Sequence, residues 1–255
     1  MELANMHGMT RNFERSVLLW DRLVALAPHE PGTLFWVART HMRAGHTERG
    51  TETTAELIES AGVEAIMTNF LVMELLRAFA DRLEHLLSDV DAIPDPEPGS
   101  QEWRHFRHVN RAVVLERLGR WQAAAGYYER LYTSCKASSV RPAPAVRGMR
   151  LRWLGYSAAK TSREHEAADA ARRLEELAST NADQLQRLDM IRWAAEIYAL
   201  SGHDSRALDL VAELLAAPAG LCVGELTLDP VWEPLHAHPR FADILREHGS
   251  HPLCR

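Results

Sequence analysis

A short phrase recurs along this chain of 255 residues: a helical stretch ends in a small turn, and a second helical stretch opens with a small residue and closes near a proline. The clearest copy runs over residues 188–217, with Ser201-Gly202 as its turn and Pro218 directly after it. Self-similarity of this kind restricts the fold more than any single residue, because each copy buries its apolar side against its neighbours. The phrase therefore predicts an array of helix pairs.

The other copies share small residues where the two helices of a pair are expected to cross. They carry, in chain order, Trp20 with Pro28, Gly119 with Ala124 and Tyr128, and Leu154-Gly155 with Ala167 and Leu174. Two helices approach closely only where a side chain is short, so the spacing of these residues is more informative than any one of them.

On these residues the chain resembles the tetratricopeptide repeat family, whose unit of about 34 residues is a helix–turn–helix with set small, aromatic and proline positions. The resemblance implies an all-α, right-handed solenoid of antiparallel helix pairs with a short C-terminal helical cap. The pattern is not complete: no copy carries every signature position, and Gly50 stands where the copy beginning near Pro31 should have Ala.

Apolar residues at three- and four-residue spacing indicate where the helices lie. They predict helices over residues 10–27, 31–45, 51–61, 63–88, 101–118, 121–136, 147–160, 164–179, 182–201 and 204–217. Capping-box spacing, in Thr161 with Glu164 and in Asn181 with Gln184, supports two of these starts. We expect N-terminal repeats over 1–88, a proline-rich acidic linker over 89–100, C-terminal repeats over 101–217 and a capping tail over 218–255.

The tail gives a second resemblance. Residues 226–245 are similar to the tail that follows tetratricopeptide arrays in many bacterial multidomain proteins. Two prolines, Pro230 and Pro239, are expected at first helical positions. Trp232, Leu235 and Phe241 could then cover the apolar face of the last repeat, as a solenoid requires for solubility. At the other end, either the family's first helix begins before Met1 or the first helix is short.

Composition indicates the class of protein. With 46% hydrophobic and 25% charged residues the chain is an ordinary globular one, and no run of about 18 apolar residues predicts a membrane span. The N-terminus lacks the basic and apolar regions of a secretory signal. Cys135, Cys222 and Cys254 have no paired spacing, so we expect a reducing, cytoplasmic setting.

Most candidates for chemistry have a structural explanation. His248, His251 and Cys254 have ligand-like spacing in what we expect to be a mobile tail. Glu102, His105 and His108 share a helical face, for which a solvated surface is the favoured interpretation, and the tryptophans at 20, 36, 121, 153 and 193 are expected in the core. Phosphate-binding loops, zinc-protease motifs and nucleophile elbows are absent from the sequence. We therefore expect no enzyme, no metal site and no cofactor.

Charge distribution points to a partner. The net charge of −6 argues against nucleic acid, yet residues 141–163 contain six basic residues and no acidic one. The basic residues are Arg141, Arg147, Arg150, Arg152, Lys160 and Arg163. In the family that this chain resembles, the first helices of the pairs line a concave groove that holds a peptide.

We expect a protein or peptide partner, with acidic ones among the candidates, and neither a nucleic acid nor a membrane. The predicted partner-binding residues are Arg147, Arg150, Arg152, Tyr156, Lys160 and Arg192. The alternative for the same stretch is a solvated helix face. The resulting hypothesis is a non-catalytic interaction scaffold; the competing one is the C-terminal regulatory part of a larger bacterial kinase, cyclase or transcription factor.

Overall fold

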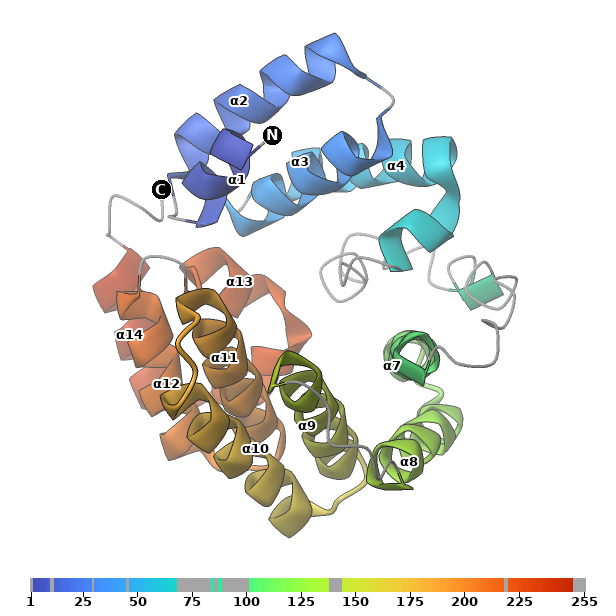
Figure 1. Cartoon of the computed structure of the whole chain (residues 1–255), viewed down its shortest axis with the longest axis vertical. Helices are drawn as coiled ribbons and strands as arrows, with labels where there is room; N and C mark the ends of the chain where they lie inside the picture. The colour runs from blue at the N-terminus through green and yellow to red at the C-terminus, as the bar shows by residue number, and fades with distance from the viewer. Residues whose placement is uncertain are drawn as a thin grey trace. The chain divides into compact units, whose positions relative to one another are not determined.

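The computed structural model describes residues 2–9, 12–28, 30–44, 46–67, 84, 87–88, 101–137, 144–217 and 220–249. Every regular element in these ranges is a helix, which confirms the predicted all-α class (Figure 1). The predicted linker at 89–100, Arg141, and the tail residues His251 and Cys254 lie outside the described residues.

The chain divides into two compact units. The first contains Met1–Arg120, Cys222–Asp229 and Glu247–Arg255; the second contains Trp121–Leu221 and Pro230–Arg246.

In the first unit, consecutive helices pack on one another. Its helices are α1 (Glu2–Met9), α2 (Phe13–Leu26), α3 (Pro31–Arg43), α4 (Thr47–Met67), α7 (Gln101–Arg117) and α13 (Val223–Leu228). Helix α2 contacts α1 and α3, α3 contacts α4, and a core forms around Ala4, Trp20 and Val37. Helix α13 joins this unit by contacting α3, where Arg43 forms an ion pair of 3.3 Å with the buried Glu225.

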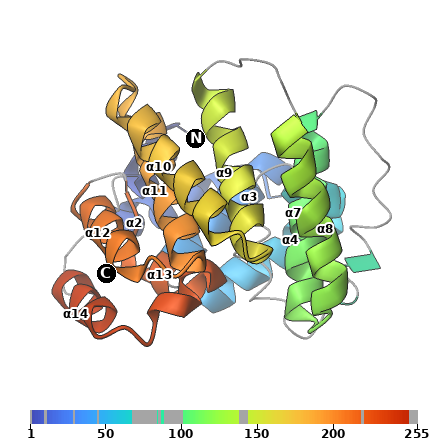
Figure 2. The ribbon, with the colours of Figure 1, turned by 90° about the horizontal axis from the view of Figure 1, so that it is seen from below.

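In the second unit, most consecutive helices pack on one another. The helices of this unit are α8 (Trp121–Ala137), α9 (Pro144–Lys160), α10 (Glu164–Ser179), α11 (Gln184–Leu200), α12 (Asp204–Ala216), the 3-10 helix η1 (Pro230–Leu235) and α14 (Pro239–Gly249). Helix α9 contacts α8, α10 and α11, and both views of the ribbon show α9, α10 and α11 adjacent (Figures 1 and 2).

The repeated turn of the sequence has a common backbone structure. At the ends of the first helices α3, α7, α9 and α11, an N–H bonds back to a carbonyl five residues earlier. The four bonds are His46 to His41, Arg120 to Leu115, Arg163 to Ala158 and His203 to Tyr198, at 2.8–2.9 Å. Gly119 and Gly202 take the left-handed conformation in two of these turns, and Ser162, with φ 60°, takes it in a third.

Small residues allow the close contact of three helices, as the sequence predicts. A Cβ atom placed on Gly155 of α9 would lie 2.6 Å from Ile197 Cδ1 of α11 and 3.0 Å from Ala170 Cβ of α10. Ala167 and Leu174 of α10 are completely buried. Gly155 therefore sits where α9 touches both neighbours.

Several expectations about the helices were wrong in detail. Helix α4 runs from Thr47 to Met67, although a break near residue 62 was expected, because a single glycine does not end a helix. The start of α11 is capped by Asp183, whose carboxylate accepts from Leu185 N–H at 2.9 Å, and not by Asn181. At α10 the N-cap residue is Arg163, with no side-chain cap.

The tail residues Trp232, Leu235 and Phe241 are buried, and η1 contacts α11, as expected of a cap. Pro230 and Pro239 begin η1 and α14, which confirms their predicted role. Of the tryptophans expected in the core, Trp20 and Trp153 are buried, whereas Trp121, at the first position of α8, is 63% exposed.

Candidate functional site

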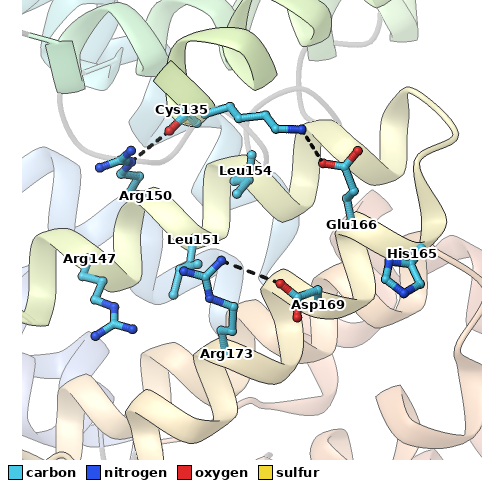
Figure 3. Close-up of a pocket in the computed structure, with 10 residues that line it drawn as sticks. Cys135, Arg147, Arg150, Leu151, Leu154, His165, Glu166, Asp169 and Arg173 are labelled. Atoms are coloured by element: carbon cyan, nitrogen blue, oxygen red, sulfur yellow. Dashed lines mark hydrogen bonds and ion pairs between the residues drawn. The ribbon is translucent and has the colours of Figure 1, made fainter. Parts of the chain in front are cut away.

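A hollow of about 810 Å³ opens in the second unit, between the end of α8 and the facing sides of α9 and α10 (Figure 3). Its walls combine charged side chains with two leucines. The lining residues are Cys135, Lys136, Arg147, Arg150, Leu151, Leu154, His165, Glu166, Asp169 and Arg173.

Helical periodicity explains how these residues come together. The lining positions of α9 are 147, 150, 151 and 154, and those of α10 are 165, 166, 169 and 173. Residues three and four apart lie on one face of a helix, so each helix presents one continuous stripe to the hollow. Arg147 and Arg150 lie toward one end, and Glu166 and His165 toward the other (Figure 3).

The carboxylate of Glu166 is bound by groups from α8. Tyr132 donates its hydroxyl hydrogen to Glu166, and Lys136 Nζ lies 3.1 Å from the same carboxylate oxygen and 2.8 Å from the Tyr132 hydroxyl. The hydrogen bond from Tyr132, followed by that from Lys136, lowers the pKa of Glu166. Glu166 is therefore ionised at neutral pH and already paired.

Asp169 is likewise engaged by residues of its own helix. Arg172 Nη2 donates to it at 2.5 Å, and Arg173 Nη1 lies 3.7 Å from its other oxygen. The hydrogen bond from Arg172 is the main reason that the pKa of Asp169 is lowered. Both acids of the hollow thus carry a negative charge that neighbouring cations compensate.

Two of the arginines of α9 also line the hollow. Arg150 Nε donates to the backbone carbonyl of Cys135 at 2.9 Å, a contact that orients its guanidinium. Arg147 is exposed and forms no ion pair with a carboxylate in the part of the chain that the structure describes. Cys135 adds no charge, because burial raises the pKa of its thiol to about 12.

Two other predicted partner-binding residues, Arg152 and Arg192, meet at a different place. Arg152 Nη2 lies 3.2 Å and Arg192 Nε 2.9 Å from the carboxylate of Glu196, which is 3% exposed. The guanidinium of Arg152 also lies over the rings of Trp153 and Trp193, at 4.7 and 5.3 Å from their centroids. Arg152 thus joins α9 to α11 through Glu196, while Arg192 binds the same carboxylate from within α11.

Tyr156 and Lys160 complete the predicted set. Tyr156 is 4% exposed, and its ring lies 6.0 Å from that of Tyr128 on α8. Lys160 Nζ lies 5.9 Å from the Tyr156 ring centroid. The six predicted residues are therefore divided. Arg147 and Arg150 line the hollow, Arg152 and Arg192 bind Glu196, Tyr156 is in the core, and Lys160 lies near the Tyr156 ring.

Sequence reasoning missed the residues that α8 and α10 contribute, of which Lys136 and Arg173 carry positive charge. The basic run of α9 drew the prediction, whereas α10 mixes acids and bases and shows no run. The predicted helices over 147–160 and 164–179 are consecutive, and pairing them would have placed side chains of the second opposite those of the first.

The structure also describes some of the other residues that the sequence offered as metal ligands. His105, expected on a solvated face, is 5% exposed, because that side of α7 is buried. Within the described ranges, no three His, Cys, Asp or Glu side chains are grouped as a metal site would require. None of the described helices is both long and apolar enough to cross a membrane.

Comparisons with known proteins add little to this geometry. No protein-family profile matches the sequence, and a comparison with curated proteins gives no match. Among solved structures, the chain is similar to PilW, a widely conserved type IV pilus biogenesis factor, with 13% identity and a TM-score of 0.47. The match covers 84% of this chain and 90% of PilW.

Proposed function

We propose that this chain is a non-catalytic helical-repeat scaffold that binds an acidic segment of a partner protein in the hollow between α8, α9 and α10. The observation that carries the proposal is the cationic end of the hollow, where the exposed Arg147 has no carboxylate partner among the described residues while the acids Glu166 and Asp169 are already compensated. An acidic ligand would pair with the guanidinium of Arg147.

The remaining walls suit a peptide. Leu151 and Leu154 lie on the α9 stripe between the charged groups, so an apolar side chain of the ligand would find contacts there. Guanidinium groups pair bidentately with carboxylates, which gives both orientation and affinity. Part of the affinity comes from partly exposed charges, and it should therefore weaken as salt is added.

The groove that the sequence suggested along α9 and α11 is less suitable for binding an acidic segment than the hollow is. Arg152 and Arg192 are committed to Glu196, and reversing the charge of Arg152 would set two carboxylates against each other in the interior. A charge-reversal experiment is informative at Arg147, whose side chain is exposed.

The test uses a fluorescein-labelled peptide with three glutamates and two leucines, and its counterpart with lysines in place of the glutamates. We expect the intact protein to bind the acidic peptide and not the basic one, and R147E to weaken binding at least tenfold. R130E is the matched control: Arg130 is an exposed arginine of α8 that does not line the hollow, and its reversal changes net charge equally.

Equal binding of the two peptides would refute the proposal, and so would equal losses in R147E and R130E. Unchanged circular dichroism of both variants shows that the fold is intact.

A further inference from the structure

Helix α2 of the first unit has one buried face and one open face. Phe13, Ser16 and Trp20 are buried on the side that packs in the unit. The opposite side, here called the outer face of α2, consists of exposed residues, namely Glu14, Arg15, Leu18, Asp21, Arg22 and Ala25. Leu18 is 51% exposed, and Leu26, 82% exposed, adjoins this face at the end of the helix. The outer face therefore has apolar area that the described part of the chain does not cover.

Charged residues flank Leu18 in a regular order. A rotation of about 100° per residue places Glu14 and Asp21 about 40–60° to one side of Leu18. The same rotation places Arg15 and Arg22 about 40–60° to the other side. The outer face thus has an acidic flank, an apolar centre and a basic flank.

These charges are not spaced to pair within their own helix. Opposite charges on a helix meet when they are three or four residues apart, as Arg172 of α10 does with Asp169 and Glu176. On α2 no acid of the outer face lies three or four residues from one of its arginines. Among the described residues, none of the four charged side chains of this face forms an ion pair. Both flanks are therefore available to a partner.

We propose that the outer face of α2 binds the same face of a second copy of this chain, with the two α2 helices parallel about a two-fold axis that runs along them. Such an axis places the acidic flank of each copy against the basic flank of the other, and it brings the two Leu18 side chains together. Glu14 would face Arg15 of the second copy, and Asp21 would face Arg22 of the second copy. A face that carries both charges in this order is self-complementary, as a two-fold interface requires.

The same charges select the direction of pairing. In an antiparallel pair of helices, the two-fold axis lies across the helices, and each flank meets its own counterpart. Acid would then face acid and arginine would face arginine, which is unfavourable. Charged residues beside an apolar stripe set the orientation of paired helices in coiled coils by the same means.

The size of the outer face limits the strength of the contact. Helix α2 has 14 residues and is about 21 Å long. Interfaces that bury less than about 1,200 Å² are typical of weak and transient complexes. We therefore expect a reversible dimer with a Kd in the micromolar range or weaker. Because its ion pairs lie at the edge of the contact, the dimer should dissociate further as salt is added.

The test measures the mass of the full chain by sedimentation equilibrium over a series of concentrations. R15E/R22E makes both flanks acidic, and E14R/D21R makes both flanks basic. We expect each variant alone to weaken the dimer at least tenfold, and an equimolar mixture of the two to restore it. R130E/R246E is the matched control for R15E/R22E: its two arginines are exposed, lie on α8 and α14, and change the net charge equally.

A cysteine at Ala25 tests the direction of pairing. In the parallel arrangement the two copies of residue 25 lie at the same height, within the Cα separation of about 7 Å that a disulfide allows. An antiparallel pair centred on Leu18 would separate them by about 21 Å along the helices. We expect A25C to form a disulfide-linked dimer under mild oxidation. The intact chain is the control for its native cysteines.

Four results would overturn the inference. The first is an intact chain that stays monomeric up to about 200 μM. The second is a dimer that persists in both charge-reversed variants, because another surface would then join the copies. The third is a mixture of the two variants that stays monomeric, and the fourth is an A25C chain that does not cross-link. Binding of an acidic segment in the hollow is tested separately and does not depend on these results.

Discussion

Glu196 provides the most demanding test of the forces that hold the second unit together. Its carboxylate is 3% exposed and accepts from two arginines, Arg152 of α9 and Arg192 of its own helix. Replacing it with alanine would leave two guanidinium charges side by side without their shared anion. Removing one partner of a buried ion pair costs about 3–5 kcal/mol.

The structure places the expected cost at the lower end of that range. The side chains of Arg152 and Arg192 are 17% and 22% exposed, so water can reach both after the carboxylate is gone. We expect E196A to lower the free energy of unfolding by about 3 kcal/mol. With a urea m-value of about 2–3 kcal/mol/M, the midpoint should fall by about 1 M.

E176A is the matched control, measured by urea denaturation followed by far-ultraviolet circular dichroism. Glu176 also lies four residues after an arginine in a helix, but its side chain is 61% exposed. Exposed pairs contribute little, and the gain in helix propensity on going from glutamate to alanine is the same at both positions. If E196A and E176A have the same urea midpoint, the cluster of Glu196, Arg152 and Arg192 does not stabilise the protein as proposed.

Three further predictions concern the helix pairs, and each is checked by urea denaturation. G155A should destabilise the protein by about 1–3 kcal/mol because the new Cβ would overlap Ile197. G126A lies on an open face of α8 and should stabilise the protein by about 0.5–1 kcal/mol. If both variants change the free energy of unfolding in the same direction, the packing argument is contradicted. S162G should relieve the left-handed strain at φ 60° and stabilise the protein by up to about 1 kcal/mol. G202A should destabilise the protein by about 1–2 kcal/mol. An S162G variant less stable than the intact protein would contradict this prediction. Glu30 caps α3 by accepting from the N–H groups of Gly32 and Thr33. Hydrogen bonding, that with the Thr33 side chain foremost, lowers the pKa of Glu30. The stabilising contribution of Glu30 is therefore present above its unfolded-state pKa and is lost as pH falls through its lowered folded-state pKa. E30A should therefore be less stable than the intact protein by about 0.5–1 kcal/mol at pH 7, with the difference vanishing in acid; a difference that stays constant with pH would show that the cap does not depend on the charge.

The helix pairs were predictable because they depend on local information. Three of the turns after a first helix contain a residue in the left-handed conformation, and Gly119 and Gly202 mark two of these turns in the sequence. The helices from α7 to α12 accordingly lie close to their predicted bounds. Ser162 fills the same role without a sequence signal, and the break expected between residues 61 and 63 is absent from α4.

The candidate site was only partly predictable, because it depends on which helices face each other. A run of basic residues on α9 pointed to Arg147 and Arg150, but the same run contains Arg152, which faces α11 and is neutralised by Glu196. When a helix packs against neighbours on two sides, periodicity alone does not show which of its faces stays accessible to a ligand. The carboxylates that decide the charge of each stripe come from elements distant in the sequence.

The most direct test of acidic-segment binding in the hollow is a charge swap between protein and ligand. The intact protein and R147E are each titrated with the glutamate peptide and the lysine peptide, and the coupling is obtained from the four dissociation constants. We predict that R147E loses affinity for the glutamate peptide and gains affinity for the lysine peptide, so that the preference moves toward the opposite charge. If the reversed side chain changes affinity for both peptides equally, the hollow is not where the charged segment binds.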